Sequence, residues 1–226
     1  MKTLAVASRS FSKNQVLRNE VLKLYPDAKF NDDGVSLNGE ALINFLAGYE
    51  KAILALETVD KSILSRLPDL KVIGKYGVGL DMIDLHAMHK YEVKLGWTGG
   101  VNKRSVSELV VSFAIYLLHR VAFANNEVKR GEWYQVKGRQ LTGRTFGIIG
   151  CGHIGKDLVK LLAPYDCTVL VHDILDYSDF YKENNITAVS LDALIKRSDV
   201  VSLHLPLNNS TKNIIICSLL NLKVIN

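Results

Sequence analysis

The chain has 226 residues, of which 48% are hydrophobic, 23% charged and 8% aromatic. These are the proportions of an ordinary globular protein, and they exclude a disordered, collagen-like or coiled-coil chain. The 28 Lys and Arg residues outnumber the 23 Asp and Glu residues, but they are spread along the chain rather than clustered. We therefore do not expect nucleic acid or another polyanion as a partner.

The cysteines and the apolar segments indicate the compartment. The 3 cysteines are Cys151, Cys167 and Cys217, without a CxxC pair, which favours a reduced protein over a disulfide framework. The N-terminal apolar run is too short for a signal peptide. The most apolar segment, residues 109–118, is about half as long as a helix that spans a bilayer. We therefore expect a cytoplasmic protein without membrane association, and we predict no metal site.

Strand and helix patterns alternate from the N-terminus. Apolar runs predict strands at residues 3–8, 28–30, 51–56, 70–73 and 93–97. Helices are predicted from Ser12 to near Pro26, over 38–47, from Asp60 to before Pro68, and over 83–89, with Ser12 and Asp60 as N-caps. Strands with interleaved helices predict a parallel, doubly wound sheet of the flavodoxin type, and we assign it to a first domain, residues 1–101.

A longer helix is predicted after Asn102. Ser105 and Glu108 have the spacing of a capping box, in which each side chain satisfies a free backbone amide. Apolar residues between 106 and 121 recur at helical spacing, so we expect this helix to bury one broad face. It would join two lobes of the protein, with a polar tail over residues 125–131.

A second series of strands and helices follows. Strands are predicted at residues 145–149, 168–172 and 200–205, helices at 156–162 and 191–196, and the start of a further strand at 223–226. The first strand runs directly into Gly150-Cys151-Gly152-His153-Ile154-Gly155, a GxGxxG sequence that opens a helix. This context is that of a dinucleotide-binding βαβ unit, so residues 102–226 are predicted to be an NAD-binding Rossmann domain. The alternative is a glycine turn in a purely structural βα unit.

Each glycine of the motif has a physical reason. Gly150 allows the tight turn, Gly152 lets the backbone approach a diphosphate, and Gly155 lets the helix pack against the strand. The free amides at the helix start, including those of His153 and Ile154, can bind the diphosphate.

An acidic residue closes the next strand. Asp173 lies 23 positions after Gly150, where a carboxylate would accept hydrogen bonds from the adenosine ribose. The carboxylate would repel a 2′-phosphate, and the following Ile174 and Leu175 supply no cation. The sequence therefore predicts NAD rather than NADP as the cofactor.

Four stretches, taken in order along the chain, are similar to the D-isomer-specific 2-hydroxyacid dehydrogenase family, which includes D-3-phosphoglycerate dehydrogenase. They are residues 70–84, 105–109, 141–155 and 198–207, with Thr211 after the last. The third stretch, which contains the glycine motif, is the most specific. The resemblance implies hydride transfer between NAD and a small 2-hydroxy or 2-oxo acid, with 3-phosphoglycerate among the candidates.

The resemblance also implies roles for particular residues. The substrate carboxylate would be held by the backbone amides of a glycine loop with a preceding lysine, namely Lys75, Tyr76, Gly77, Val78 and Gly79. Glycines leave such amides open to an anion, and a surface position is the alternative for the lysine. The end of a later strand would line the cofactor site with His204, Pro206 and, further on, Thr211.

The catalytic residues of the family have no match. The reaction needs an Arg to stabilise the charge that develops on the ketone oxygen, a His as acid–base and a Glu to orient it. The Arg would follow an Ile-Asn pair that Ile225-Asn226 resembles, and we assign no catalytic residue within the 226 residues. We therefore expect a C-terminally truncated, inactive chain with an incomplete Rossmann domain.

Two kinds of function stay open. One is an oxidoreductase whose missing part is supplied by further chain or by a partner, and the family resemblance suggests a homodimer through the cofactor domain and the long helix. The other is a non-catalytic NAD-binding or interaction protein, or a decayed gene product.

Overall fold

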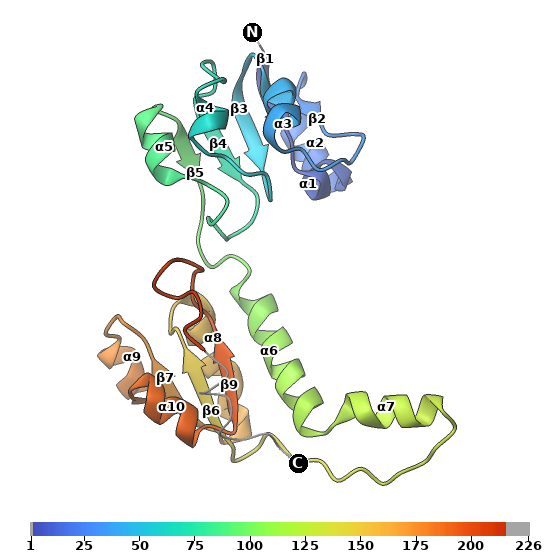
Figure 1. Ribbon diagram of the computed structural model, residues 1–226, viewed down its shortest axis with the longest axis vertical. Coiled ribbons are helices and arrows are strands. Elements are labelled where there is room, and N and C mark those ends of the chain that lie inside the picture. Colours follow the sequence, from blue (N-terminus) through green and yellow to red (C-terminus); the bar gives the residue numbers. More distant parts are fainter. Residues whose placement is uncertain (1, 216–226) are drawn as a thin grey trace. The chain divides into compact units, whose positions relative to one another are not determined.

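The computed structural model describes residues 2–215 (Figure 1). The chain forms two compact units, Met1–Gly99 and Gly100–Asn226, each built on a parallel sheet. The boundary predicted from the sequence lies slightly further along, after residue 101. The predicted class, two doubly wound α/β domains, is confirmed by this architecture.

The sheet of the first unit has five strands in the order β2-β1-β3-β4-β5. They are β1 (Lys2–Val6), β2 (Lys29–Phe30), β3 (Tyr49–Leu54), β4 (Val72–Lys75) and β5 (Lys94–Gly96). Every pairing is parallel. This is the flavodoxin-like order, in which ligands bind at the carboxyl ends of the strands.

Helices cover both faces of this sheet. They are α1 (Arg9–Lys13), α2 (Gln15–Leu24), α3 (Gly39–Leu46), α4 (Lys61–Leu64) and α5 (Leu85–Lys90). The larger core contains buried residues of α3, α4 and α5 with those of β1, β3 and β4. A smaller core packs Phe11 and the apolar side of α2 against Leu4, Val6 and Phe30.

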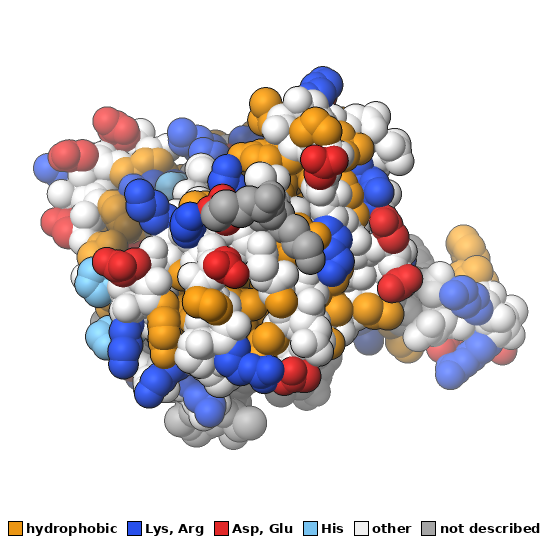
Figure 2. Space-filling model, turned by 90° about the horizontal axis from the view of Figure 1, so that it is seen from above, with side chains coloured by type: hydrophobic (Ala, Val, Ile, Leu, Met, Phe, Trp, Pro, Cys, Tyr) orange, Lys and Arg blue, Asp and Glu red, His pale blue; other side chains and the backbone are white. Residues whose placement is uncertain are grey.

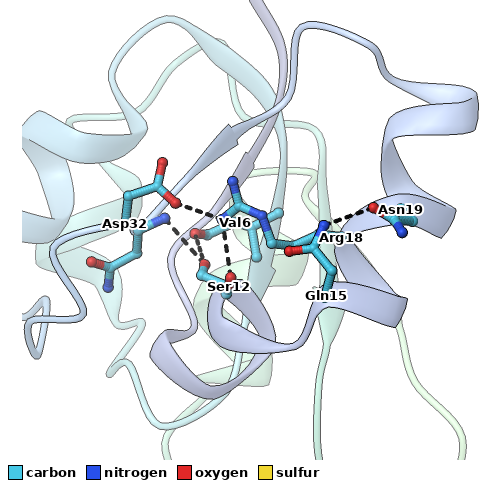
Figure 3. A network of polar contacts seen from close by, with 7 residues as sticks. Val6, Ser12, Gln15, Arg18, Asn19 and Asp32 are labelled. Atoms are coloured by element: carbon cyan, nitrogen blue, oxygen red, sulfur yellow. Dashed lines mark hydrogen bonds and ion pairs between the residues drawn. The ribbon is translucent and has the colours of Figure 1, made fainter.

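The start of the first helical region differs from the prediction. Ser8 caps α1, and Asn14 caps α2, whereas Asp60 caps α4 as predicted. Ser12 was expected to be a cap. Its hydroxyl is instead buried, donates to the Val6 carbonyl and accepts from the Asn31 amide (Figure 3). The prediction for Ser12 is therefore wrong, because the hydroxyl bonds to the sheet instead of to a helix end.

The same region carries an ion pair. Arg18 of α2 donates to Asp32 and to the Ser12 carbonyl, and Gln15 donates to Asn19 along the helix (Figure 3). The contact with Asp32 fastens α2 to the loop after β2. On the molecular face in Figure 2, Lys and Arg side chains are interspersed with Asp and Glu, as the spread of charges along the sequence indicates.

The sheet of the second unit has four described strands in the order β8-β7-β6-β9. They are β6 (Thr145–Ile149), β7 (Thr168–His172), β8 (Thr187–Ala188) and β9 (Val200–Leu203). All pairings are parallel, and the order is that of the first strands of a Rossmann sheet. Within residues 2–215, β9 is an edge strand, and its Val201 and Leu203 are exposed.

The helices of this sheet are α8 (His153–Leu162), a 3-10 turn (Ala163–Tyr165), α9 (Ser178–Glu183) and α10 (Leu191–Arg197). Helix α8 begins directly after Gly152, earlier than predicted. Sequence analysis did not predict α9 and β8, which are short. The strand predicted at 223–226 lies outside the described residues.

The long helix is divided in two, α6 (Lys103–Leu118) and α7 (Val121–Lys129), which meet at an angle of 63° (Figure 1). Arg120 has a left-handed backbone conformation, with φ of 56°, and this interrupts the helix. The predicted capping box is also wrong. Asn102 occupies the N-cap, so Ser105 lies inside the helix, where it cannot cap the end.

The buried face of this helix is narrower than expected. Within α6 only Ser107, Ala114 and Leu118 are buried. Small residues let α6 lie close to α8, and the Ser107 hydroxyl donates to the Ile154 carbonyl. Val110, Val111 and Ile115 are partly buried and pack against the same core, whereas Leu109, Phe113, Tyr116 and Leu117 are exposed.

No single helix in residues 2–215 is long and apolar enough to cross a membrane. Helices α6 and α7 reach that length and composition only together, across their bend.

Candidate functional site

The glycine motif forms a tight turn between β6 and α8. Gly150 has φ of 96°, and a Cβ there would lie 2.5 Å from the His204 carbonyl oxygen. A Cβ on Gly155 would collide with the Gly150 carbonyl, so this glycine allows α8 to pack on the turn. By contrast, a Cβ on Gly152 would meet no atom within 4 Å. The backbone at Gly152 is therefore open to a ligand, while the other two glycines are required by packing.

The N-terminus of α8 lies beside this opening. Gly152 is the N-cap and offers no side chain to the first amides of the helix. The first amide to bond inside the helix is that of Lys156, which donates to the Gly152 carbonyl. The preceding amides, including those of His153 and Ile154, have no intrahelical partner and can donate to an anion.

Asp173 is fixed beside the same turn. One carboxylate oxygen accepts from the Cys151 amide and the other from the Leu175 amide, the latter at 2.9 Å. The side chain is half-buried, so its remaining lone pairs are available to a ligand. The next residue, Ile174, is 94% exposed and carries no charge. The structure thus brings the carboxylate to the glycine turn, as the sequence spacing predicts.

The cysteine inside the motif is unreactive. Cys151 is fully buried, and burial raises the pKa of its thiol to about 11. The thiol is therefore protonated at neutral pH and does not act as a nucleophile. It fills space beneath the turn.

Lys156, on the first turns of α8, packs over two aromatic rings. Its ammonium lies 3.6 Å from the centroid of the Tyr177 ring and 5.4 Å from that of Phe180. This cation–π arrangement holds the lysine on the aromatic residues that follow β7. Sequence analysis missed these aromatic residues, because no pattern links them to α8.

His204, Pro206 and Thr211 follow β9. The His204 amide donates to the Ile149 carbonyl, and its ring contacts the Ser202 hydroxyl at 2.9 Å. Burial lowers the pKa of His204, which favours the neutral imidazole. The Thr211 hydroxyl donates to the Pro206 carbonyl and thereby closes the turn that contains both residues.

Asn208 shapes this turn, and sequence analysis missed it. Its side-chain oxygen accepts from the amides of Ser210 and Thr211. The Asn-x-Ser-Thr sequence is a signal for such an Asx turn.

The glycine loop of the first unit follows β4. The Tyr76 amide donates to the Leu54 carbonyl at 2.7 Å, as a continuation of the sheet. The expectation that this amide binds the substrate carboxylate is therefore corrected. The Tyr76 ring packs edge-on against the Phe11 ring, with 5.1 Å between the centroids.

The remaining amides of the loop are open. Among the described residues, the amides of Gly77, Val78 and Gly79 have no hydrogen-bond acceptor. Gly77 has φ of 123°, which a residue with a side chain rarely adopts. The indole nitrogen of Trp97 donates to the Val78 carbonyl at 3.0 Å and holds the loop from outside.

Lys75 lies next to these amides. Its ammonium donates to the Ala55 carbonyl. A Cβ on Gly77 would lie 3.4 Å from the same ammonium. Burial lowers the pKa of Lys75, and the carboxylates of Glu57 and Asp81 oppose that shift. Buried Glu57 was not found in the sequence because only the pairing of β3 and β4 brings it to the lysine.

Comparisons with known proteins agree with these features. Residues 111–222 match the family model described as D-isomer specific 2-hydroxyacid dehydrogenase, NAD binding domain. A glyoxylate reductase of Thermofilum pendens is 33% identical over 173 residues, which are 73% of this chain and 51% of that protein. An (S)-sulfolactate dehydrogenase of Chromohalobacter salexigens is 32% identical over 201 residues, 86% of this chain and 65% of the relative. This chain thus spans about half to two thirds of these relatives.

A solved structure gives the same result. The D-lactate dehydrogenase of Aquifex aeolicus, in complex with NAD and lactic acid, superposes with a TM-score of 0.83 at 26% identity. The match covers 98% of this chain and 66% of that protein. The chain therefore belongs to the D-isomer-specific 2-hydroxyacid dehydrogenase family and carries that family's NAD-binding domain.

Proposed function

We propose that this chain binds NAD and a small 2-hydroxy or 2-oxo acid as part of an NAD-dependent oxidoreductase that transfers hydride between them. The observation that carries the proposal is the turn of the second unit. Gly152 is open, the first amides of α8 are free, and the Asp173 carboxylate is fixed beside them. These are the requirements of a diphosphate and a ribose bound to one βα unit.

Each residue of the turn has a role in this proposal. The diphosphate lies against Gly150, Gly152 and Gly155 and accepts hydrogen bonds from the amides of His153 and Ile154. Asp173 accepts from the ribose hydroxyls. Further along the cofactor, the wall is formed by the residues after β9: His204, Pro206 and Thr211.

The same residues select NAD over NADP. A 2′-phosphate would be repelled by Asp173, and the adjacent Ile174 and Leu175 are exposed apolar residues that cannot neutralise it. Lys156 is engaged by the Tyr177 and Phe180 rings.

The substrate is bound by the first unit. Its carboxylate accepts from the open amides of Gly77, Val78 and Gly79, and Lys75 adds positive charge beside them. The similar proteins are named for glyoxylate, hydroxypyruvate, sulfolactate and 3-phosphoglycerate. A small acid of this type is therefore the proposed substrate.

The 226 residues contain no match to the family's catalytic Arg, Glu and His. We accordingly propose that these residues alone bind the cofactor without turning it over. A non-catalytic NAD-binding or interaction protein is the second candidate.

A homodimer is also proposed, formed through α6 and α7. Leu109, Phe113 and Leu117 are spaced four residues apart along α6 and are 51%, 55% and 71% exposed. Trp133 and Tyr134 line a cavity of about 400 Å³ with α7. An exposed apolar surface of this kind is typical of a subunit interface.

Steady-state NADH oxidation with glyoxylate, hydroxypyruvate and pyruvate tests the catalytic part of the proposal. We expect no turnover by the 226-residue chain, although NADH binds and quenches tryptophan fluorescence. Turnover above the background would show that the chain supplies its own acid–base. Absence of both turnover and NADH binding would refute the proposal as a whole.

A further inference from the structure

The substrate loop of the first unit is surrounded by charges of both signs. Lys75 places a cation at this loop, and its ammonium already donates to the Ala55 carbonyl. Glu57 is only 6% exposed, and its carboxylate accepts from the Ala55 amide at 2.6 Å. The lysine is thus anchored to the carbonyl of Ala55 and the glutamate to its amide.

A second carboxylate lies beside the loop. Asp81 is exposed, and its Oδ1 would be 2.8 Å from a Cβ on Gly79. The Glu57 and Asp81 carboxylates both act on the Lys75 ammonium, opposing the effect of its burial. Before any ligand binds, Lys75, Glu57 and Asp81 together therefore carry a net negative charge.

This balance limits what the loop can accept. One carboxylate can bind to the amides of Gly77, Val78 and Gly79 while the lysine offsets one acidic neighbour. A further phosphate or sulfonate on the ligand adds negative charge to a loop at which Lys75, Glu57 and Asp81 already sum to a negative charge, and like charges repel.

We propose that Glu57 and Asp81 are specificity-determining residues that restrict the loop to monoanionic 2-hydroxy and 2-oxo acids and disfavour phosphorylated or sulfonated ones. This inference rests on the proposed function, because it takes the loop as the substrate-carboxylate site. It distinguishes between the substrates for which the similar proteins are named.

D-Glycerate and D-3-phosphoglycerate form a matched ligand pair, since they differ only in the phosphate. Both are titrated into the 15N-labelled 226-residue chain at low salt, and the amide shifts of Gly77, Val78 and Gly79 give the dissociation constants. We expect D-glycerate to bind at least about fivefold more tightly than D-3-phosphoglycerate.

Two variants test whether the Glu57 and Asp81 carboxylates cause the preference for D-glycerate. Glu57→Gln keeps an oxygen that can accept from the Ala55 amide, and Asp81→Asn changes an exposed side chain, so that one variant tests the inference if the other is unstable. Each is expected to reduce the preference for D-glycerate by about two- to threefold. Glu20→Gln, which removes an exposed carboxylate on α2, should leave the preference unchanged.

The outcomes separate this inference from the proposed function. Equal or tighter binding of D-3-phosphoglycerate to the unmodified chain would overturn the inference and leave the carboxylate site intact. An unchanged preference in both variants would also overturn it. If neither ligand shifts the amides of the loop, the carboxylate site itself is wrong, and the inference fails with it.

Discussion

At the scale of single residues, the glycines of the βα turn have two different roles, one in packing and one in ligand binding. Gly155 is enclosed by the turn itself, whereas Gly152 faces open space. Alanine at Gly155 should therefore lower stability, whereas alanine at Gly152 should weaken ligand binding.

Gly155→Ala is expected to destabilise the second unit by about 1–3 kcal/mol, because the new methyl group overlaps the Gly150 carbonyl. Gly152→Ala should leave the thermal stability unchanged and weaken NADH binding by about tenfold, because the methyl group occupies the approach of the diphosphate. Differential scanning fluorimetry and NADH titration measure these effects. Loss of stability in Gly152→Ala, or unchanged NADH affinity in a folded Gly152→Ala, would contradict the assignment.

The sequence was sufficient to find these residues because the motif is local. The turn, the helix start and the acidic end of β7 are all set by the spacing within one βαβ unit. By contrast, the sheet pairing that occupies the Tyr76 amide joins residues far apart in the sequence. The same holds for the electrostatic effect of Glu57 on Lys75, which no local pattern reveals.

At the scale of elements, burial explains which predictions held. Strands β6 and β7 have the predicted bounds, since each is a buried apolar run that ends at a turn residue. The break between α6 and α7 could not be predicted, because Arg120 adopts a left-handed conformation without being glycine. The short α9 and β8 lack an apolar period long enough to be recognised.

The apolar stripe of α6 has a different meaning from the one expected. A helical period shows that one face is apolar, but not whether the chain itself or a second molecule covers it. In this structure one part of the stripe packs against the chain's own core, whereas Leu109, Phe113 and Leu117 are exposed, and these three residues support the proposed dimer.

Leu117→Ser tests the dimer at this stripe. Leu117 is 71% exposed, so its replacement should leave folding intact while shifting the chain from dimer to monomer. Sedimentation velocity measures the change, and Leu24→Ser on α2, where the leucine is 78% exposed, is the matched control. A monomeric unmodified chain, or a Leu117→Ser variant that dimerises as before, would count against this interface.

At the scale of the whole molecule, the proposed function divides the chemistry between the two units. The unit Met1–Gly99 contains the open amides to which we assign the substrate carboxylate, and the unit Gly100–Asn226 contains the turn to which we assign the dinucleotide. Length and composition alone did not indicate this division. It followed from motifs at the carboxyl ends of parallel strands, where both sheets are expected to bind ligands.

The central claim is that the turn between β6 and α8 binds NAD through Asp173, and isothermal titration calorimetry of NADH and NADPH tests it most directly. We expect NADH to bind at least about tenfold more tightly than NADPH, and Asp173→Asn to weaken NADH binding by about tenfold, with Asp179→Asn as the control. Equal affinity for the two cofactors, or an Asp173→Asn variant that binds NADH as tightly as the unmodified chain, would contradict the account.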